Sequence, residues 1–72
     1  MAERTLGNRL KDIRTARGLT QTDLAALVGV SRKTINTVEN AVFVPSTLLA
    51  LALAKVLETT VEALFFIVEG EN

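Results

Sequence analysis

The chain has 72 residues, eight basic and eight acidic side chains, and neither cysteine nor histidine. A chain of this length forms one domain with a small core, and the missing residue types exclude disulfides, Cys/His zinc sites and nucleophiles activated by histidine. We therefore expect residues 1–72 to form a single domain that is not an enzyme and that holds no cofactor and no metal. The N-terminal residues are interrupted by charges at every turn, so we expect no membrane segment and a cytoplasmic location.

The first expected element is a helix from about Glu3 to Arg17. Leu6, Leu10 and Ile13 follow the i, i+4, i+7 spacing of one apolar helix face. Gly18 then supplies the left-handed residue that commonly follows a helix.

A second helix is expected to begin at Gln21 and to end at Gly29. Thr20 is placed as its N-cap, and Asp23 completes a capping box in which aspartate replaces the usual glutamate or glutamine. The residues expected on its buried face are Leu24, Leu27 and Val28.

A third helix is expected after Ser31, which is a good N-cap residue. Its inward residues are Ile35 and Val38, and its outward residues are Arg32, Lys33, Asn36 and Thr37. Helices this short are marginal in isolation, so the second and third must brace each other. Residues 20–40 therefore predict a helix-turn-helix.

The outward residues of this third helix have the chemistry of DNA recognition. Arginine or lysine pairs with the guanine edge in the major groove, and asparagine can pair with adenine. Residues 1–40 carry seven Lys and Arg against four Asp and Glu, a net +3, whereas residues 41–72 carry one Lys against four Glu, a net −3. This split predicts a positive end on an otherwise neutral molecule.

The run LKDIRTARGLTQTDLAALVGVSRKTINTVEN, followed by VPS, resembles the phage-repressor family of regulators, the Cro and lambda-repressor or Xre type. The resemblance implies an all-α fold, a compact five-helix domain with the helix from Ser31 in the major groove. It implies that Gln21 contacts phosphate and braces that helix, and that Asn40 begins a loop that approaches the DNA backbone. The complete set of implied DNA-binding residues is Gln21, Ser31, Arg32, Lys33, Asn36, Thr37 and Asn40. It also implies a structural salt bridge between Arg14 and Glu39.

The sequence departs from the family pattern at two positions where glycine is usual. Ala41 follows the third helix, and Glu58 precedes the last one. We expect a looser helix end or a residue held at positive φ at some energetic cost.

The second half of the chain is unusually apolar. Ser46 and Thr60 are expected to cap two further helices, the first running from Thr47 to about Leu57. More apolar side chains follow than a small domain can bury, which predicts an exposed interface. We expect homodimerisation through the C-terminal helices and tail, residues 46–69, and in particular through Leu48, Leu51, Ala52, Phe66, Ile67 and Val68. The alternatives are an unusually apolar core or a face that covers a following domain.

Taken together, these patterns predict sequence-specific binding to double-stranded DNA by a small transcriptional regulator, with the helix at residues 31–40 in the major groove. The alternative is a protein-interaction module, or a partner protein of the antitoxin or controller type, that uses the apolar C-terminal half.

Overall fold

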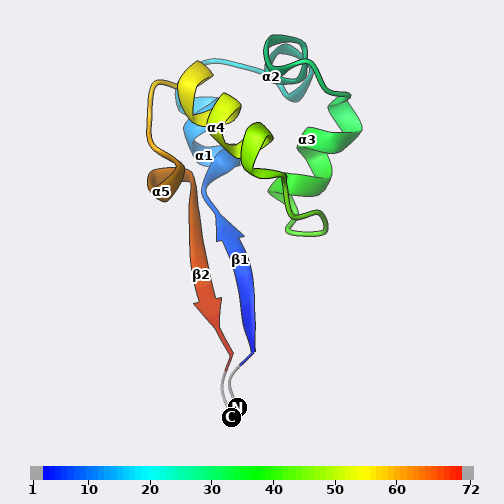
Figure 1. Cartoon of the computed structure of the whole chain (residues 1–72). Helices are drawn as coiled ribbons and strands as arrows, with labels where there is room; N and C mark the ends of the chain where they lie inside the picture. The colour runs from blue at the N-terminus through cyan, green and yellow to red at the C-terminus, as the bar shows by residue number, and fades with distance from the viewer. Residues whose placement is uncertain (1–2, 71–72) are drawn as a thin grey trace.

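The structure, a computed structural model, describes residues 3–70. Within these residues, five short helices form a compact body, and two strands project from it as a single arm (Figure 1). The arm makes the molecule elongated, with principal extents of 39 × 22 × 21 Å. The elements in chain order are β1 (Arg4–Asn8), α1 (Leu10–Ala16), α2 (Gln21–Val28), α3 (Arg32–Glu39), α4 (Thr47–Val56), α5 (Val61–Leu64) and β2 (Phe65–Glu69).

The five-helix helix-turn-helix body matches the expected architecture, but the fold is not strictly all-α. Strands β1 and β2 pair antiparallel, with Leu6 opposite Ile67 and Gly7 opposite Phe66. The helix expected from Glu3 therefore begins only at Leu10. The Asn8 side-chain oxygen accepts the Leu10 backbone N–H at 3.1 Å, a local bond that favours a helix start at this point.

The two strands form because each has a partner far away in the sequence. The β2 residues Phe-Phe-Ile-Val are aromatic and β-branched and so favour an extended chain. Cross-strand pairing places Leu6 and Ile67 on one face of the arm, and Gly7 and Phe66 on the other. The first face continues into the helical body, where Leu6 packs against the core.

The expected helix boundaries after residue 17 agree closely with the structure. Thr20 and Asp23 form the capping box, and the backbone and hydroxyl groups of Thr20 hold the pKa of Asp23 below its ordinary value. The side chains of Ser31, Ser46 and Thr60 each accept a backbone N–H at the start of the next helix.

The core lies where all five helices meet the base of the arm. Its fully enclosed side chains are Leu10, Leu24, Ile35, Val38, Leu53, Leu57 and Leu64. The expected burial of Leu27 is wrong: this side chain is 57% exposed, and Ala25 lies in the core instead. Helices α2 and α3 pack against each other, and Ala25 belongs to the core cluster.

Both positions where the sequence lacks the usual glycine adopt the left-handed conformation. Ala41 has φ of 59° and Glu58 has φ of 56°. In both cases the backbone N–H of the next residue donates a hydrogen bond back to the end of the preceding helix. The Val42 N–H donates to the Thr37 carbonyl, and the Thr59 N–H donates to the Ala54 carbonyl, both at 2.9 Å. These helix ends are therefore closed at the cost of backbone strain, as expected.

Helix α4, with ten residues, is the longest in the part of the chain that the structure describes. Among residues 3–70, no helix combines the length and the hydrophobicity that crossing a lipid bilayer requires.

Candidate nucleic-acid interface

Helices α2 and α3 form the expected helix-turn-helix. Gly29 ends α2 in the left-handed conformation with φ of 76°, and Ser31 begins α3 two residues later by accepting the Thr34 N–H at 3.2 Å. Ile35 is fully buried and Val38 is 1% exposed. The inner face of α3 is thus fixed against the core, so the direction of its outer face is fixed too.

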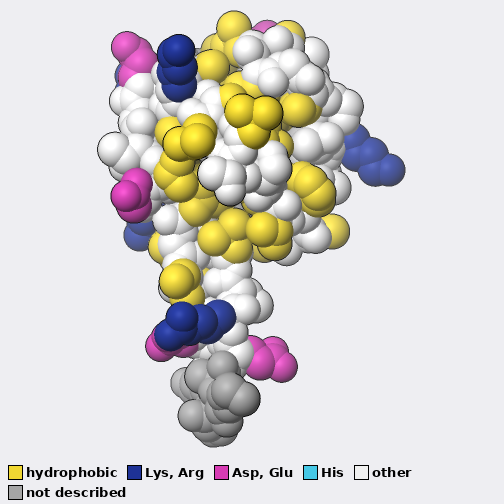
Figure 2. All heavy atoms as spheres, in the orientation of Figure 1, with side chains coloured by type: hydrophobic (Ala, Val, Ile, Leu, Met, Phe, Trp, Pro, Cys, Tyr) yellow, Lys and Arg dark blue, Asp and Glu magenta, His cyan; other side chains and the backbone are white. Residues whose placement is uncertain are grey.

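The first turn of α3 presents two basic side chains to solvent. Arg32 and Lys33 are both exposed, and within residues 3–70 neither forms an ion pair. Figure 2 shows basic side chains projecting from the side of the molecule where α3 lies in Figure 1. Positive charge at a helix N-terminus opposes the helix dipole, so an anionic partner stabilises this arrangement.

A chain of hydrogen bonds joins the base of α3 to α1 and α2. The Arg14 guanidinium binds both oxygens of Glu39, at 2.6 and 3.2 Å, and also donates to the Leu19 carbonyl at 2.8 Å. The Gln21 amide nitrogen donates to Glu39 at 2.9 Å and to the Asn36 side-chain oxygen at 3.2 Å. The structure therefore brings together four of the residues that the sequence analysis selected, and it makes Gln21 a direct brace of α3.

Asn40 completes this chain of contacts at the end of α3. Its amide nitrogen donates to the Asn36 carbonyl at 2.9 Å and to the Asn36 side-chain oxygen at 3.2 Å. Thr37 is half-buried, and its hydroxyl donates to the Thr34 carbonyl at 2.9 Å. The Ser31 hydroxyl lies 3.0 Å from that of Thr34. These polar side chains are thus ordered by α3 itself, whereas Arg32 and Lys33 extend freely.

The charge split along the sequence does not produce a separate positive end in space. Antiparallel pairing of the strands brings Arg4 within 3.2 Å of Glu69, and Arg17 lies 3.7 Å from Glu58. Two cations of the first half are thus paired with acids of the second. Exposed Arg9, Lys11, Arg32 and Lys33 form no ion pair within residues 3–70, and of these only Arg32 and Lys33 lie on α3. In the described part of the chain, no cluster of acidic residues is suited to hold a metal ion.

The residues expected at the dimer interface do not form one patch. Leu48 and Leu51 on α4 are 79% and 56% exposed, and Ala52 is half-buried beside them. Ile67 shares the inner face of the arm with Leu6, but Phe66 and Val68 lie on the opposite face, where both would contact a Cβ at Gly7. Strand alternation separates them, because successive side chains of β2 point to opposite faces.

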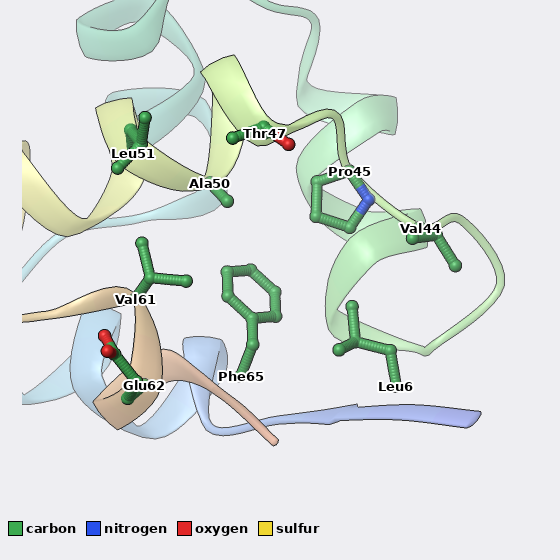
Figure 3. Close-up of a pocket in the computed structure, with 9 residues that line it drawn as sticks. All are labelled: Leu6, Val44, Pro45, Thr47, Ala50, Leu51, Val61, Glu62 and Phe65. Atoms are coloured by element: carbon green, nitrogen blue, oxygen red, sulfur yellow. The ribbon is translucent and has the colours of Figure 1, made fainter. Parts of the chain in front are cut away.

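Leu51 belongs to an apolar groove that the sequence analysis did not foresee. The groove has a volume of about 500 Å³, and Figure 3 shows it between the base of the arm, α4, α5 and the loop before α4. Figure 2 shows hydrophobic side chains gathered over this face. Its lining residues are Leu6, Val44, Pro45, Thr47, Ala50, Leu51, Val61, Glu62 and Phe65. Exposed Val44, directly before Pro45 in the apolar loop that precedes α4, is the sequence signal that could have pointed to it.

Comparison with known proteins agrees with this geometry. Residues 10–64 match the family model HTH_3, described as helix-turn-helix. The chain is 38% identical over 65 residues to a protein from Bacillus subtilis named as the HTH-type transcriptional regulator YgzD, covering 90% of this chain and 97% of that protein. It is 41% identical over 64 residues to an HTH-type transcriptional regulator from Methanocaldococcus jannaschii, covering 89% and 97% of the two chains.

Solved structures of regulators have the same fold. The restriction-modification controller protein C.AhdI from Aeromonas hydrophila superposes with a TM-score of 0.72 at 36% identity, over 76% of this chain and 83% of that one. The clp gene regulator ClgR from Corynebacterium glutamicum gives a TM-score of 0.69 at 25% identity, over 72% and 55%. Together with the exposed basic start of α3, these matches show that the chain belongs to the HTH_3 helix-turn-helix family of DNA-binding transcriptional regulators.

Proposed function

We propose that this DNA-binding regulator reads a specific duplex sequence by placing α3 in the major groove, and that it does so as a homodimer on a two-fold symmetric site. The observation that carries the proposal is the pair Arg32 and Lys33, exposed and without an ion-pair partner within residues 3–70, on a helix whose opposite face is buried. A rigid helix of this kind can hold side chains at a fixed height against base edges.

The individual residues have different roles in this proposal. Arg32 and Lys33 are long enough to reach either guanine or a phosphate. Ser31 and Thr37 lie on the flanks of the same surface, where hydroxyl groups can bind phosphate. Gln21 and Asn40 act mainly as braces, because their amide nitrogens already donate to protein oxygens. Arg14 and Glu39 hold the base of α3 and have no DNA contact of their own.

The partner proposed for the apolar face is a second copy of the chain. Leu48 and Leu51 project from α4, and the groove beside them is lined mainly by apolar side chains. Burying such a face removes an exposed apolar patch that is unusual for a monomer. A two-fold dimer also places two α3 helices for two half-sites. We further propose that residues 1–72 act as one domain and that the protein acts in the cytoplasm, where its DNA lies.

A second candidate is a controller-type partner protein, in which the apolar face binds another protein and DNA binding serves that complex. The observation that favours this version is the apolar groove with exposed Leu51 at its edge, which a partner protein can cover. Both candidate functions use the same α3 surface for DNA. They differ in whether a second copy of the chain or another protein covers the apolar groove.

Selection of bound duplexes from a random pool tests the proposal most fully, because half-site sequence and spacing emerge together. The selected duplex is then titrated at two salt concentrations. Binding through α3 should weaken steeply with salt, since phosphate contacts release counterions. A pool without enrichment, in dilute buffer, would refute sequence-specific binding.

A further inference from the structure

We infer that Asn36 presents only hydrogen-bond donors to DNA and therefore selects guanine over adenine at the base pair it faces. This inference rests on the proposed placement of α3 in the major groove. The inference concerns the Asn36 side chain alone. Its basis is the chain of hydrogen bonds that links Asn36 to Gln21, Glu39 and Asn40. Asparagine by itself is the side chain expected to pair with adenine.

The buried end of this chain of hydrogen bonds decides which atoms donate and which accept. Glu39 is bound by the Arg14 guanidinium, and its side chain is 3% exposed. A carboxylate paired with arginine only accepts hydrogen bonds. The Gln21 atom that lies 2.9 Å from Glu39 must therefore be the amide nitrogen, and its second hydrogen points to the atom of Asn36 at 3.2 Å. That atom must in turn be the Asn36 oxygen.

Asn40 fixes the same orientation from the other side. Its amide group lies 2.9 Å from the Asn36 backbone carbonyl, which only accepts, so the nitrogen of Asn40 faces Asn36. That nitrogen also donates to the Asn36 side-chain oxygen at 3.2 Å. Both lone pairs of this oxygen are thus occupied, by Gln21 and by Asn40. The nitrogen of Asn36, with its two hydrogens, is therefore the part of the amide that can still bind a base.

A donor-only amide discriminates among bases. Adenine presents an acceptor beside a donor, and pairing with both requires a free oxygen on the asparagine, which Asn36 does not have. Guanine presents two neighbouring acceptors, N7 and O6, and suits an amino group. Using Asn36 to bind adenine would require breaking the bonds from Gln21 and Asn40. Breaking the bond from the half-buried Gln21 amide is the costlier of the two, because Asn40 is exposed.

The first test compares selected sites for the native protein and for two variants. The native protein should prefer guanine at one position of each half-site, and Asn36→Ala should remove this preference, a change of roughly 5- to 150-fold at that position alone. Asn36→Asp keeps the acceptor for Gln21 and Asn40 but makes the outward atom an acceptor. It should therefore shift the preference at that position to cytosine, whose N4 donates.

A second variant tests the positioning role of the hydrogen-bond chain. Gln21→Ala combined with Asn40→Ala frees the Asn36 oxygen, so adenine should become acceptable at that one position while preferences elsewhere remain. Thermal unfolding of each variant separates this effect from loss of the fold. A native protein that prefers adenine at that position overturns the inference. So does a variant Asn36→Ala that loses the same affinity on all sequences, because that result would mark a phosphate contact.

An independent measurement needs no DNA. In the free protein, NMR should show slow hydrogen exchange for the Gln21 side-chain amide and fast exchange for that of Asn36. The reverse order would overturn the inference even if the protein binds DNA as proposed. Failure to enrich any duplex, with the exchange order as expected, would instead refute the proposed function, and the base preference of Asn36 with it.

Discussion

Arg14 and Glu39, 25 positions apart in the chain, form a buried ion pair in which the guanidinium Nε lies 2.6 Å from the carboxylate. The two side chains are 9% and 3% exposed. The pair joins the end of α1 to the end of α3, and it also anchors the hydrogen bonds that reach Asn36. Contacts inside the protein therefore fix the orientation of α3.

We predict that Glu39→Ala will lower the free energy of unfolding by about 3–5 kcal/mol, because it leaves the Arg14 charge buried without a partner. Chemical denaturation measures this change. The matched control is Glu69→Ala, which removes a pair whose side chains are 69% and 59% exposed and should cost about 0–1 kcal/mol. Similar losses of unfolding free energy for the two variants would show that the buried ion pair stabilises the fold no more than the exposed one.

Gly7 should not tolerate a side chain. A Cβ at this position would lie 2.7 Å from the Phe66 ring carbon Cζ and 2.8 Å from the Val68 Cγ2. The Arg9 guanidinium lies over this ring at 4.7 Å from its centroid, so turning the ring away also loses this contact. Gly7→Ala should cost about 1–3 kcal/mol in thermal or chemical unfolding.

A double-mutant cycle checks the cause of this loss. In a Phe66→Ala background the clash with the ring is absent, so Gly7→Ala should cost clearly less than in the native protein. Equal costs in both backgrounds would place the origin of the effect elsewhere.

Two substitutions should stabilise the protein. Ala41→Gly and Glu58→Gly remove a side chain from a residue at positive φ, and each should raise the free energy of unfolding by about 0.5–1 kcal/mol after the added flexibility of the unfolded chain is subtracted. Ala26→Gly, at an exposed position inside α2, is the control and should cost about 1 kcal/mol. A loss of stability with Ala41→Gly would contradict the expected strain at that position.

The apolar face of α4 should control the oligomeric state. Leu51→Glu places a charge at the proposed two-fold interface, so sedimentation should show a monomer with its helix content unchanged. Leu27→Glu, on an exposed residue of α2, is the control and should leave the mass unchanged. A native protein that is already monomeric at high concentration would rule out the dimer, and a monomer that binds other proteins would favour the controller-type function.

The sequence predicts the helical body well because its signals are local. Thr20 with Asp23, Ser31 and Gly29 mark helix ends within a few residues, and such caps depend only on neighbouring backbone groups. Of the residues expected to point outward from α3, Arg32 and Lys33 are exposed, whereas Asn36 and Thr37 are half-buried. The resemblance to phage repressors added the pairing of Arg14 with Glu39, which no local pattern contains.

The arm could not be predicted in the same way. Leu6, Leu10 and Ile13 fit a helical spacing, yet Leu6 is in a strand whose partner is Ile67. The pairing joins segments about 60 residues apart, and only tertiary packing decides between helix and strand for such short apolar runs. Phe66, Ile67 and Val68 are grouped in one expected interface only because all three are apolar, and strand alternation puts Ile67 on the opposite face from the other two.

The measurement that tests DNA recognition by α3 most directly is the affinity of Arg32→Ala and Lys33→Ala for a duplex selected by the native protein. Lys55→Ala serves as the control, since Lys55 lies in the last turn of α4, at the end remote from α3 (Figure 1). The α3 variants should bind more weakly by about 1–3 kcal/mol each, with unchanged unfolding, and Lys55→Ala should bind normally. Native affinity in both α3 variants, or the same loss in all three proteins, would contradict recognition by this helix.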